Sequence, residues 1–278
     1  MKIYMHWDME GTSGLFTRDQ AWYWHDGVPE QVAAEGCRLI TEDVNSAAQA
    51  ALDAGVDEVI VCDTHHGGGN IILEEAISDP RITVHGKSRD ATGRWMPDLD
   101  ESVDALMLPG HHAKAGTPDA FLSHTWSLIW DDFQINGQSV GEMGIEACYA
   151  GYWDIPVTMV KGDETACVEA EALFPGVVTA AVKRAESYEL ASGLAPEEAR
   201  ALTAHKVKEA IANLRQAPPK PYKPSLPMTV TIRMAHTDDA VKAMQRPGVS
   251  RLDDHTVACD VERQCDVVKW IIDTGLPD

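Results

Sequence analysis

The stretch that decides the fold is KIYMHWDMEG, residues 2–11, in which an alternating strand pattern runs directly into acidic residues. A second apolar and β-branched run, residues 56–62, ends in the same way at Asp63. Between the two runs, small or apolar residues recur with a period close to that of a helix from Ala33 to Ala51, and Gly55 follows as a helix stop. This strand, helix, strand order favours parallel strands and an α/β fold.

Further strands and helices are expected beyond this first unit. The apolar patterns predict strands at residues 82–85, 104–108, 157–160 and 177–182, and helices at residues 141–151, 165–174 and 196–216. We therefore predict a three-layer α/β/α main domain over residues 1–216, which holds the metal-binding and catalytic residues.

The C-terminal part of the chain is set off by prolines. Residues 217–227 contain prolines at a density that excludes a helix interior or a central strand, and we interpret them as a stiff linker. After this linker the pattern predicts a strand, a helix, a second strand and a final helix that ends near Gly275. Residues 228–278 are thus expected to form a small α+β portion or to continue the main sheet.

The charge of the chain excludes several classes of function. The 278 residues include 44 acidic and 23 basic side chains, which gives a formal charge of -21. Such a protein repels nucleic acid phosphates and anionic lipids, so we expect no nucleic acid or membrane partner. The sequence has no apolar stretch long enough for a membrane span and no secretory signal pattern at its N-terminus, which predicts a cytoplasmic location.

The six cysteines are scattered and form no CxxC pair, so we interpret them as buried free thiols. They therefore support neither a disulfide framework nor a zinc ribbon.

Chemically active side chains gather at the ends of the predicted strands. Asp8 and Glu10 end the first strand, and residues two apart on a strand point to the same side. Imidazoles follow the next strands, at His65 and His66, at His111 and His112, and at His124. An Asp-x-Glu pair alone is often a solvated strand end, but carboxylates and imidazoles delivered together by three strand ends favour a metal site. Glu142, at the start of a predicted helix, either completes the ligand set or only favours the helix N-terminus.

This mixture of imidazole and carboxylate ligands suits zinc, with Mn²⁺ or Co²⁺ as alternatives, whereas Ca²⁺ and Mg²⁺ prefer oxygen ligands. Phosphate-binding loops of the GxxxxGK[ST] and GxGxxG types are absent from the sequence, as are the GxSxG and HExxH motifs. The remaining histidines, His6 among them, are interpreted as structural or surface residues. The aromatic residues from Trp22 to Trp24 either line a substrate pocket or cover the core.

Taken together, these clusters resemble the D-aminopeptidase family of peptidase M55. The motifs that carry the resemblance are DMEGTSG at residues 8–14, DTH at 63–65, GHHAKA at 110–115, SH at 123–124 and VGEMG at 140–144, and the similarity continues through residues 150–157, 162–163 and 179–183. It is close over roughly the first two-thirds of the chain and only general in the last third.

The resemblance implies a zinc-dependent aminopeptidase with two adjacent metal ions per chain, acting on short peptides, with D-amino acids at their N-termini as the family's substrate. It implies five metal ligands, Asp8, Glu10, His65, His112 and Glu142. We hypothesise that Asp8 bridges the two ions, with Glu10 and His65 completing one ligand set and His112 and Glu142 the other.

The family's SH motif implies that His124 is a catalytic histidine, and in the same register His66 and His111 are neighbours of ligands. Members of the family assemble as self-compartmentalising rings, typically decamers, so a homo-oligomeric ring is expected here too.

This sequence departs from the family pattern at His6 and Trp7, where small or aliphatic residues are common, and in its tryptophan-rich segment after Ala21. These departures bear on substrate choice. Two alternatives stay open: a two-metal amidohydrolase or phosphoesterase acting on a non-peptide substrate, and a non-catalytic protein that binds metal or peptide.

Overall fold

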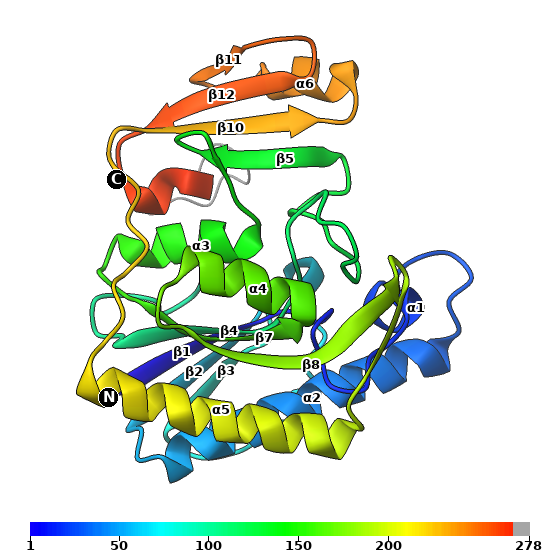
Figure 1. The fold of residues 1–278 in the computed structure, drawn as a ribbon, viewed down its shortest axis with the longest axis vertical. Coiled ribbons are helices and arrows are strands. Elements are labelled where there is room, and N and C mark those ends of the chain that lie inside the picture. The colour runs from blue at the N-terminus through cyan, green and yellow to red at the C-terminus, as the bar shows by residue number, and fades with distance from the viewer. Residues whose placement is uncertain (269–278) are drawn as a thin grey trace.

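The computed structural model describes residues 1–268, and its centre is a sheet of seven strands within these residues (Figure 1). The strand order is β3-β2-β1-β4-β7-β8-β9, with parallel pairing everywhere except between β8 and β9. The strands are β1 (Lys2–Trp7), β2 (Glu58–Asp63), β3 (Ile82–His85), β4 (Ala105–His111), β7 (Val157–Asp163), β8 (Val178–Ser187) and β9 (Leu190–Gly193).

Helices cover both faces of this sheet. Figure 1 shows α2 (Glu30–Asp53) and α5 (Pro196–Gln216) on one face and α3 (Glu142–Gly151) and α4 (Glu164–Leu173) on the other. The short helix α1 (Arg18–Ala21) and the turn η1 (His65–Gly67) lie in the loops that follow β1 and β2. The predicted α/β fold with helices on both sides of a parallel sheet is therefore confirmed.

The side chains of β1 explain why two layers form. Ile3, Met5 and Trp7 point into one apolar core with the residues of α2 and α5, whereas Tyr4 belongs to the other core, with α3. Successive side chains of a strand point to opposite faces, so a central strand that is buried on both faces must be apolar on both. His6 is a fully buried polar residue of β1, and it faces Glu146 of α3.

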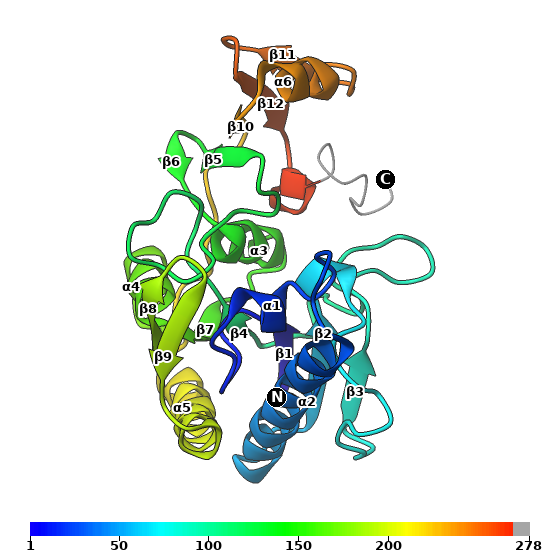
Figure 2. The ribbon, with the colours of Figure 1, turned by 90° about the vertical axis from the view of Figure 1, so that its right-hand side faces the viewer.

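A second sheet packs beyond α3, as both views show (Figure 1 and Figure 2). Its order is β11-β12-β10-β5-β6, and its strands are β5 (Trp130–Ile135), β6 (Gln138–Ser139), β10 (Met228–Met234), β11 (Val249–Arg251) and β12 (Thr256–Val261). Helix α6 (Thr237–Ala243) and the turn η2 (Gln264–Val268) accompany it. The C-terminal strands thus pair with β5 and do not extend the main sheet, and the second sheet takes strands from both sides of the proline-rich stretch.

The hairpin of β5 and β6 is absent from the strands expected from the sequence. Its turn is formed by Asn136 and Gly137, both with positive φ, which is the geometry of a tight two-residue hairpin. The Asn-Gly pair was the local signal that identifies it. The expected final helix near Gly275 lies outside the described residues, apart from η2.

The topology brings three strand ends together. β1 lies between β2 and β4, so the carboxyl ends of these parallel strands meet at one edge of the sheet, with the first turn of α3 nearby. Within the described part of the chain, no helix is both long enough and apolar enough to cross a membrane.

Candidate metal centre

The side chains singled out in the sequence meet at this edge of the sheet. Asp8 is the residue after β1, His65 opens η1 just beyond β2, and His112 is the residue after β4. Glu142 is the first residue of α3, and His124 lies in the long loop between β4 and β5. Glu10 joins them from the turn after Asp8. All six predicted site residues therefore lie in one cluster, which we call the main cluster.

The turn that carries Asp8 and Glu10 is pressed against the end of β4. The backbone N–H of Asp8 donates to the carbonyl of Pro109 at 3.0 Å, and the N–H of Gly11 donates to the carbonyl of Gly110 at 2.6 Å. Gly110 has a φ of +84°, and a Cβ atom there would collide with the carbonyl oxygen of Asp8. Only glycine allows both the backbone angle and the close approach, so the GHHA sequence fixes the distance between the two ligand-bearing loops.

Three of the six side chains form a first group of potential ligands. His65 Nδ1 lies 2.7 Å from Asp8 Oδ1 and 3.2 Å from Glu10 Oε2. All three residues are at least nine-tenths buried. On its other side, His65 Nε2 lies 2.8 Å from the carbonyl oxygen of Ala21. Because a carbonyl oxygen only accepts, Nε2 must be the protonated nitrogen, and the Nδ1 lone pair faces the two carboxylates.

A second group shares Asp8 with the first. His112 Nε2 lies 3.4 Å from Asp8 Oδ2 and 3.3 Å from Glu142 Oε1, while its Nδ1 lies 3.0 Å from the carbonyl oxygen of Ala113. His112 thus repeats the arrangement of His65, with one nitrogen donating to the backbone and the other facing carboxylates. Nitrogen and carboxylate oxygen atoms that face one another in this way form a suitable ligand set for a metal ion.

Two buried atoms of the main cluster have no hydrogen-bond partner and are available as ligands. Glu10 Oε2 and His112 Nε2 are both buried and have no hydrogen-bond partner. Burial opposes the ionised form of Glu10, but the neighbouring His65 and His112 outweigh burial and hold its pKa well below the usual value. The same balance, with burial outweighed by Glu142 and Asp8, raises the pKa of His112. The donor set of imidazoles and carboxylates fits zinc or a similar ion.

His124 lies at the edge of the main cluster. Its Nδ1 lies 2.8 Å from the carbonyl oxygen of Leu122, so its Nε2 carries the free lone pair, which is 3.6 Å from Glu142 Oε1. Its ring stacks on His112, with a distance of 4.0 Å between the ring centroids. Burial and the adjacent His112 lower the pKa of His124. The structure therefore presents a neutral imidazole with its basic nitrogen toward the cluster.

Several residues that hold the cluster in place were missed from the sequence. Trp22 Nε1 donates to Glu10 Oε1 at 2.7 Å, which leaves Oε2 for a metal ion. The backbone N–H of Trp126 donates to Glu142 Oε1 at 2.8 Å, and Lys183 Nζ donates to the carbonyl oxygen of Glu10 at 2.7 Å. Trp22 lines the cavity and is also buried in the core that contains α2, so it has both roles considered for the tryptophan-rich segment. Lys183 is distant in the sequence and no local pattern marks it.

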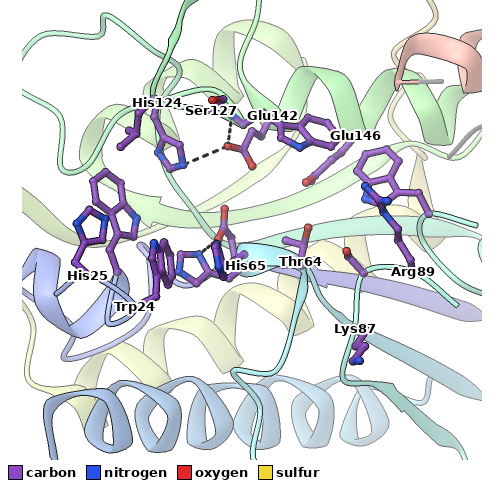
Figure 3. A pocket seen from close by; sticks show the side chains of 18 residues that line it. Trp24, His25, Thr64, His65, Lys87, Arg89, His124, Ser127, Glu142 and Glu146 are labelled. Atoms are coloured by element: carbon purple, nitrogen blue, oxygen red, sulfur yellow. Dashed lines mark hydrogen bonds and ion pairs between the residues drawn. The ribbon is translucent and has the colours of Figure 1, made fainter. Parts of the chain in front are cut away.

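The main cluster opens into a cavity of about 720 Å³ (Figure 3). In Figure 3, His65, His124 and Glu142 point into the cavity, Trp24 and His25 lie on one side, and Lys87 and Arg89 lie on the opposite side of the view. The cavity thus offers carboxylates and metal ligands at its centre and two cationic side chains at one end.

Comparison with known proteins agrees with this geometry. A family model described as D-aminopeptidase, peptidase M55, matches residues 1–272, so the similarity extends through the C-terminal third. A D-aminopeptidase of Bacillus subtilis (strain 168) is 34% identical over 248 residues, which is 89% of this chain and 86% of the relative. The structure of the zinc-dependent D-aminopeptidase DppA from Bacillus subtilis, a self-compartmentalizing protease, superposes with a TM-score of 0.89 at 32% identity and covers 99% of this chain and 96% of that one.

Proposed function

Because this chain belongs to the D-aminopeptidase family of peptidase M55, we propose that it uses two zinc ions to hydrolyse short peptides that begin with a D-amino acid. It is a metallo-aminopeptidase, a hydrolase that removes residues from the amino ends of peptides. The observation that carries the two-ion proposal is that Asp8 belongs to two separate groups of potential ligands, one with Glu10 and His65 and one with His112 and Glu142.

In this proposal each group holds one ion and Asp8 bridges the pair. Zinc supplies Lewis acidity there, which polarises the scissile carbonyl and lowers the pKa of a water nucleophile from 15.7 to about 7. The residues around the ions provide the rest. Trp22 fixes Oε1 of Glu10, which leaves Oε2 toward His65 and the proposed ion. The backbone N–H of Trp126 instead holds Oε1 of Glu142, the oxygen that faces His112.

We assign proton transfer to His124. Its Nδ1 is committed to the carbonyl oxygen of Leu122, and the lowered pKa keeps Nε2 unprotonated near neutral pH. That nitrogen can accept a proton beside the ligands and pass it to the leaving amine, a role worth roughly 10² to 10⁴ in rate. His124 belongs to neither of the two groups that share Asp8, which favours the catalytic role, although with Glu10 and His112 it forms a further group of potential ligands.

Charges in the cavity suit both ends of a short peptide. The carboxylates of the main cluster favour the substrate's ammonium group, while Lys87 and Arg89 at one end of the cavity can attract its carboxylate. A peptide with only a few residues would place both termini in the cavity at once.

We further propose that the protein forms a closed homo-oligomeric ring, such as a decamer, in the cytoplasm. Its native metal is Zn²⁺, and Mn²⁺ or Co²⁺ can substitute for it. A self-compartmentalizing relative supports the ring. Metal sites that face an internal chamber would admit short peptides and exclude folded proteins, and symmetric closure is the usual outcome for soluble homo-oligomers.

The test of this function is a substrate panel. We expect the zinc-loaded protein to hydrolyse D-Ala-D-Ala faster than L-Ala-L-Ala, and to hydrolyse the free dipeptide faster than its C-terminal amide. A chelator should abolish both reactions. p-Nitrophenyl phosphate and a non-peptide amide such as acetanilide serve as controls. Preferred hydrolysis of either control, or no turnover of any peptide by the metal-loaded ring, would reject the proposal in favour of the alternative hydrolases or a binding protein.

A further inference from the structure

A second group of potential ligands lies behind the main cluster. It consists of His6 in β1, His111 at the end of β4 and Glu146 in α3, and we call it the inner cluster. His6 and His111 are fully buried, and Glu146 is 2% exposed. Each member is a near neighbour in sequence of a residue of the main cluster, because Asp8, His112 and Glu142 lie on the same three elements. The metal-binding hypothesis does not use any of the three inner residues.

The spacing of the inner cluster matches that of the main cluster. His6 Nδ1 lies 3.0 Å from Glu146 Oε1, and His111 Nε2 lies 2.7 Å from Glu146 Oε2. In the main cluster the distances between facing potential ligand atoms run from 2.7 Å, between His65 Nδ1 and Asp8 Oδ1, to 3.6 Å, between His124 Nε2 and Glu142 Oε1. Two imidazoles and one carboxylate are also a ligand set that zinc commonly uses where one position stays open.

Both imidazoles direct a ring nitrogen at the carboxylate of Glu146. His111 Nδ1 lies 3.4 Å from the carbonyl oxygen of Pro109, which directs its Nε2 lone pair at Glu146. The fully buried ring of His6 approaches Glu146 Oε1 through Nδ1, but the contact does not have hydrogen-bond alignment, and Nε2 has no hydrogen-bond partner. A cation placed between His6, His111 and Glu146 would give these buried atoms a common partner.

A route to the inner cluster exists. Glu146 lines the cavity, together with Trp95, and Figure 3 shows its carboxylate on the cavity side of α3. The ring of Trp95, which also lines the cavity, meets His6 edge-on, with 5.6 Å between the ring centroids. An ion could therefore enter from the cavity and keep its remaining coordination position directed toward it.

From this geometry we propose that His6, His111 and Glu146 form a third metal site, which binds a divalent transition-metal ion of the zinc class. Two neutral imidazoles and one carboxylate leave a net charge of +1 around a divalent ion. The third site goes beyond the proposed peptidase function, because it uses none of the residues assigned to that function. It places an additional cation at the wall of the substrate cavity.

Metal content tests the proposal directly. The full-length protein and the variants Glu146→Gln and His6→Ala would be stripped with chelator, dialysed against excess zinc, desalted and analysed for zinc per chain. We expect each variant to bind about one equivalent less than the wild-type protein. His85→Gln is the matched control. His85 Nε2 lies 2.9 Å from Asp98 Oδ2 and belongs to neither cluster, so its loss should leave the zinc content unchanged. Equal zinc content in wild-type protein and folded Glu146→Gln would overturn the third site.

A second measurement does not depend on the folding of any variant. Crystals of the wild-type protein soaked in zinc should show an anomalous peak at the zinc edge between His6, His111 and Glu146. Full peaks at the main cluster with none at the inner cluster would contradict the third site and leave the proposed function intact. A peak at the inner cluster without peaks at Asp8 would contradict the proposed function and support the third site.

Discussion

Two buried carboxylates at the ends of neighbouring strands have opposite surroundings. Asp63 ends β2, and Trp7, the residue before Asp8, pairs with it in register. Asp63 accepts hydrogen bonds from the backbone N–H groups of Gly69, Asn70 and Ile71 and from the Asn70 side chain, at 2.7 to 3.0 Å. Asp8 faces imidazole nitrogens that belong to His65 and His112.

The difference shows that position at a strand end does not decide the role of a carboxylate. Backbone N–H donors satisfy Asp63, so that it fastens the glycine-rich loop that carries His65. His65 and His112 each donate one ring N–H to a backbone carbonyl and turn the other ring nitrogen toward Asp8. This arrangement makes Asp8 a candidate ligand of a metal ion. The partners of the carboxylate, and not its place in the sheet, therefore separate a candidate metal ligand from a structural residue.

Glu169 in α4 adds a third case. It accepts a hydrogen bond from the backbone N–H of Lys114 at 2.8 Å, and its other oxygen is buried without a partner. Burial raises the pKa of Glu169, whereas the histidines beside Glu10 hold the pKa of that carboxyl low. An unpartnered oxygen by itself thus favours a bound proton over a bound metal.

The largest effect is expected at the shared ligand. Asp8→Ala should empty both groups of ligands and lower kcat/KM by roughly 10³ or more, since metal ions contribute several kcal/mol to the transition state. Glu10→Gln should lower the occupancy of one ion more than the other. Elemental analysis together with peptide hydrolysis checks both results. Retention of full metal content in Asp8→Ala would show that Asp8 does not bridge the ions.

The next largest effect separates a catalytic residue from a ligand. His124→Ala should keep the wild-type metal content and lower kcat by roughly 10² to 10⁴, because the proton acceptor is lost while both groups around Asp8 remain. His205→Ala on the exposed face of α5 is a control with unchanged kcat. Loss of metal and activity together would reassign His124 as a ligand.

A smaller effect is expected at the structural carboxylate. Asp63→Ala leaves three backbone N–H groups without their acceptor and should destabilise the protein by about 1 to 3 kcal/mol. Thermal unfolding of the metal-free protein isolates this effect from metal binding. Asp79→Ala, which removes an exposed ion pair with Arg81, should change the melting temperature far less. Equal shifts in the two variants would contradict the structural role of Asp63.

The smallest effect is expected at Glu169 and depends on pH. The folded protein binds the Glu169 proton more tightly than the unfolded chain does, so this contribution to stability is present below the unfolded pKa and is lost as pH rises through the folded pKa. Glu169→Gln lacks this dependence. The difference in melting temperature, Glu169→Gln minus wild type, should therefore rise by about 1 to 3 °C as the pH goes from about 5 to about 8. A constant difference would show that the pKa of Glu169 is not raised.

The parts of the fold that follow local periodicity could be predicted, because alternating and helical patterns mark β1, β2 and α2 directly. The meeting of Asp8, His65 and His112 also follows from parallel strand order. Contacts between distant segments could not be predicted in this way. Lys183 reaches the backbone of Glu10 from β8, where nothing in its own sequence marks the role.

The inner cluster illustrates the same limit. The sequence interpretation of His6 is a structural or surface residue isolated from the carboxylate clusters, and Glu146 lies within an ordinary helical pattern. Only the packing of α3 on β1 and β4 brings these side chains within 3.0 Å of each other. Local patterns thus locate the ligands at strand ends, and tertiary packing decides which other groups join them.

The most direct test of the central claim is to remove the metal and return it. The chelator-treated protein, with its metal content measured, should show no hydrolysis of D-Ala dipeptides, and activity should return in proportion to the zinc added until the groups around Asp8 are filled. A metal-free preparation with full activity would contradict the account.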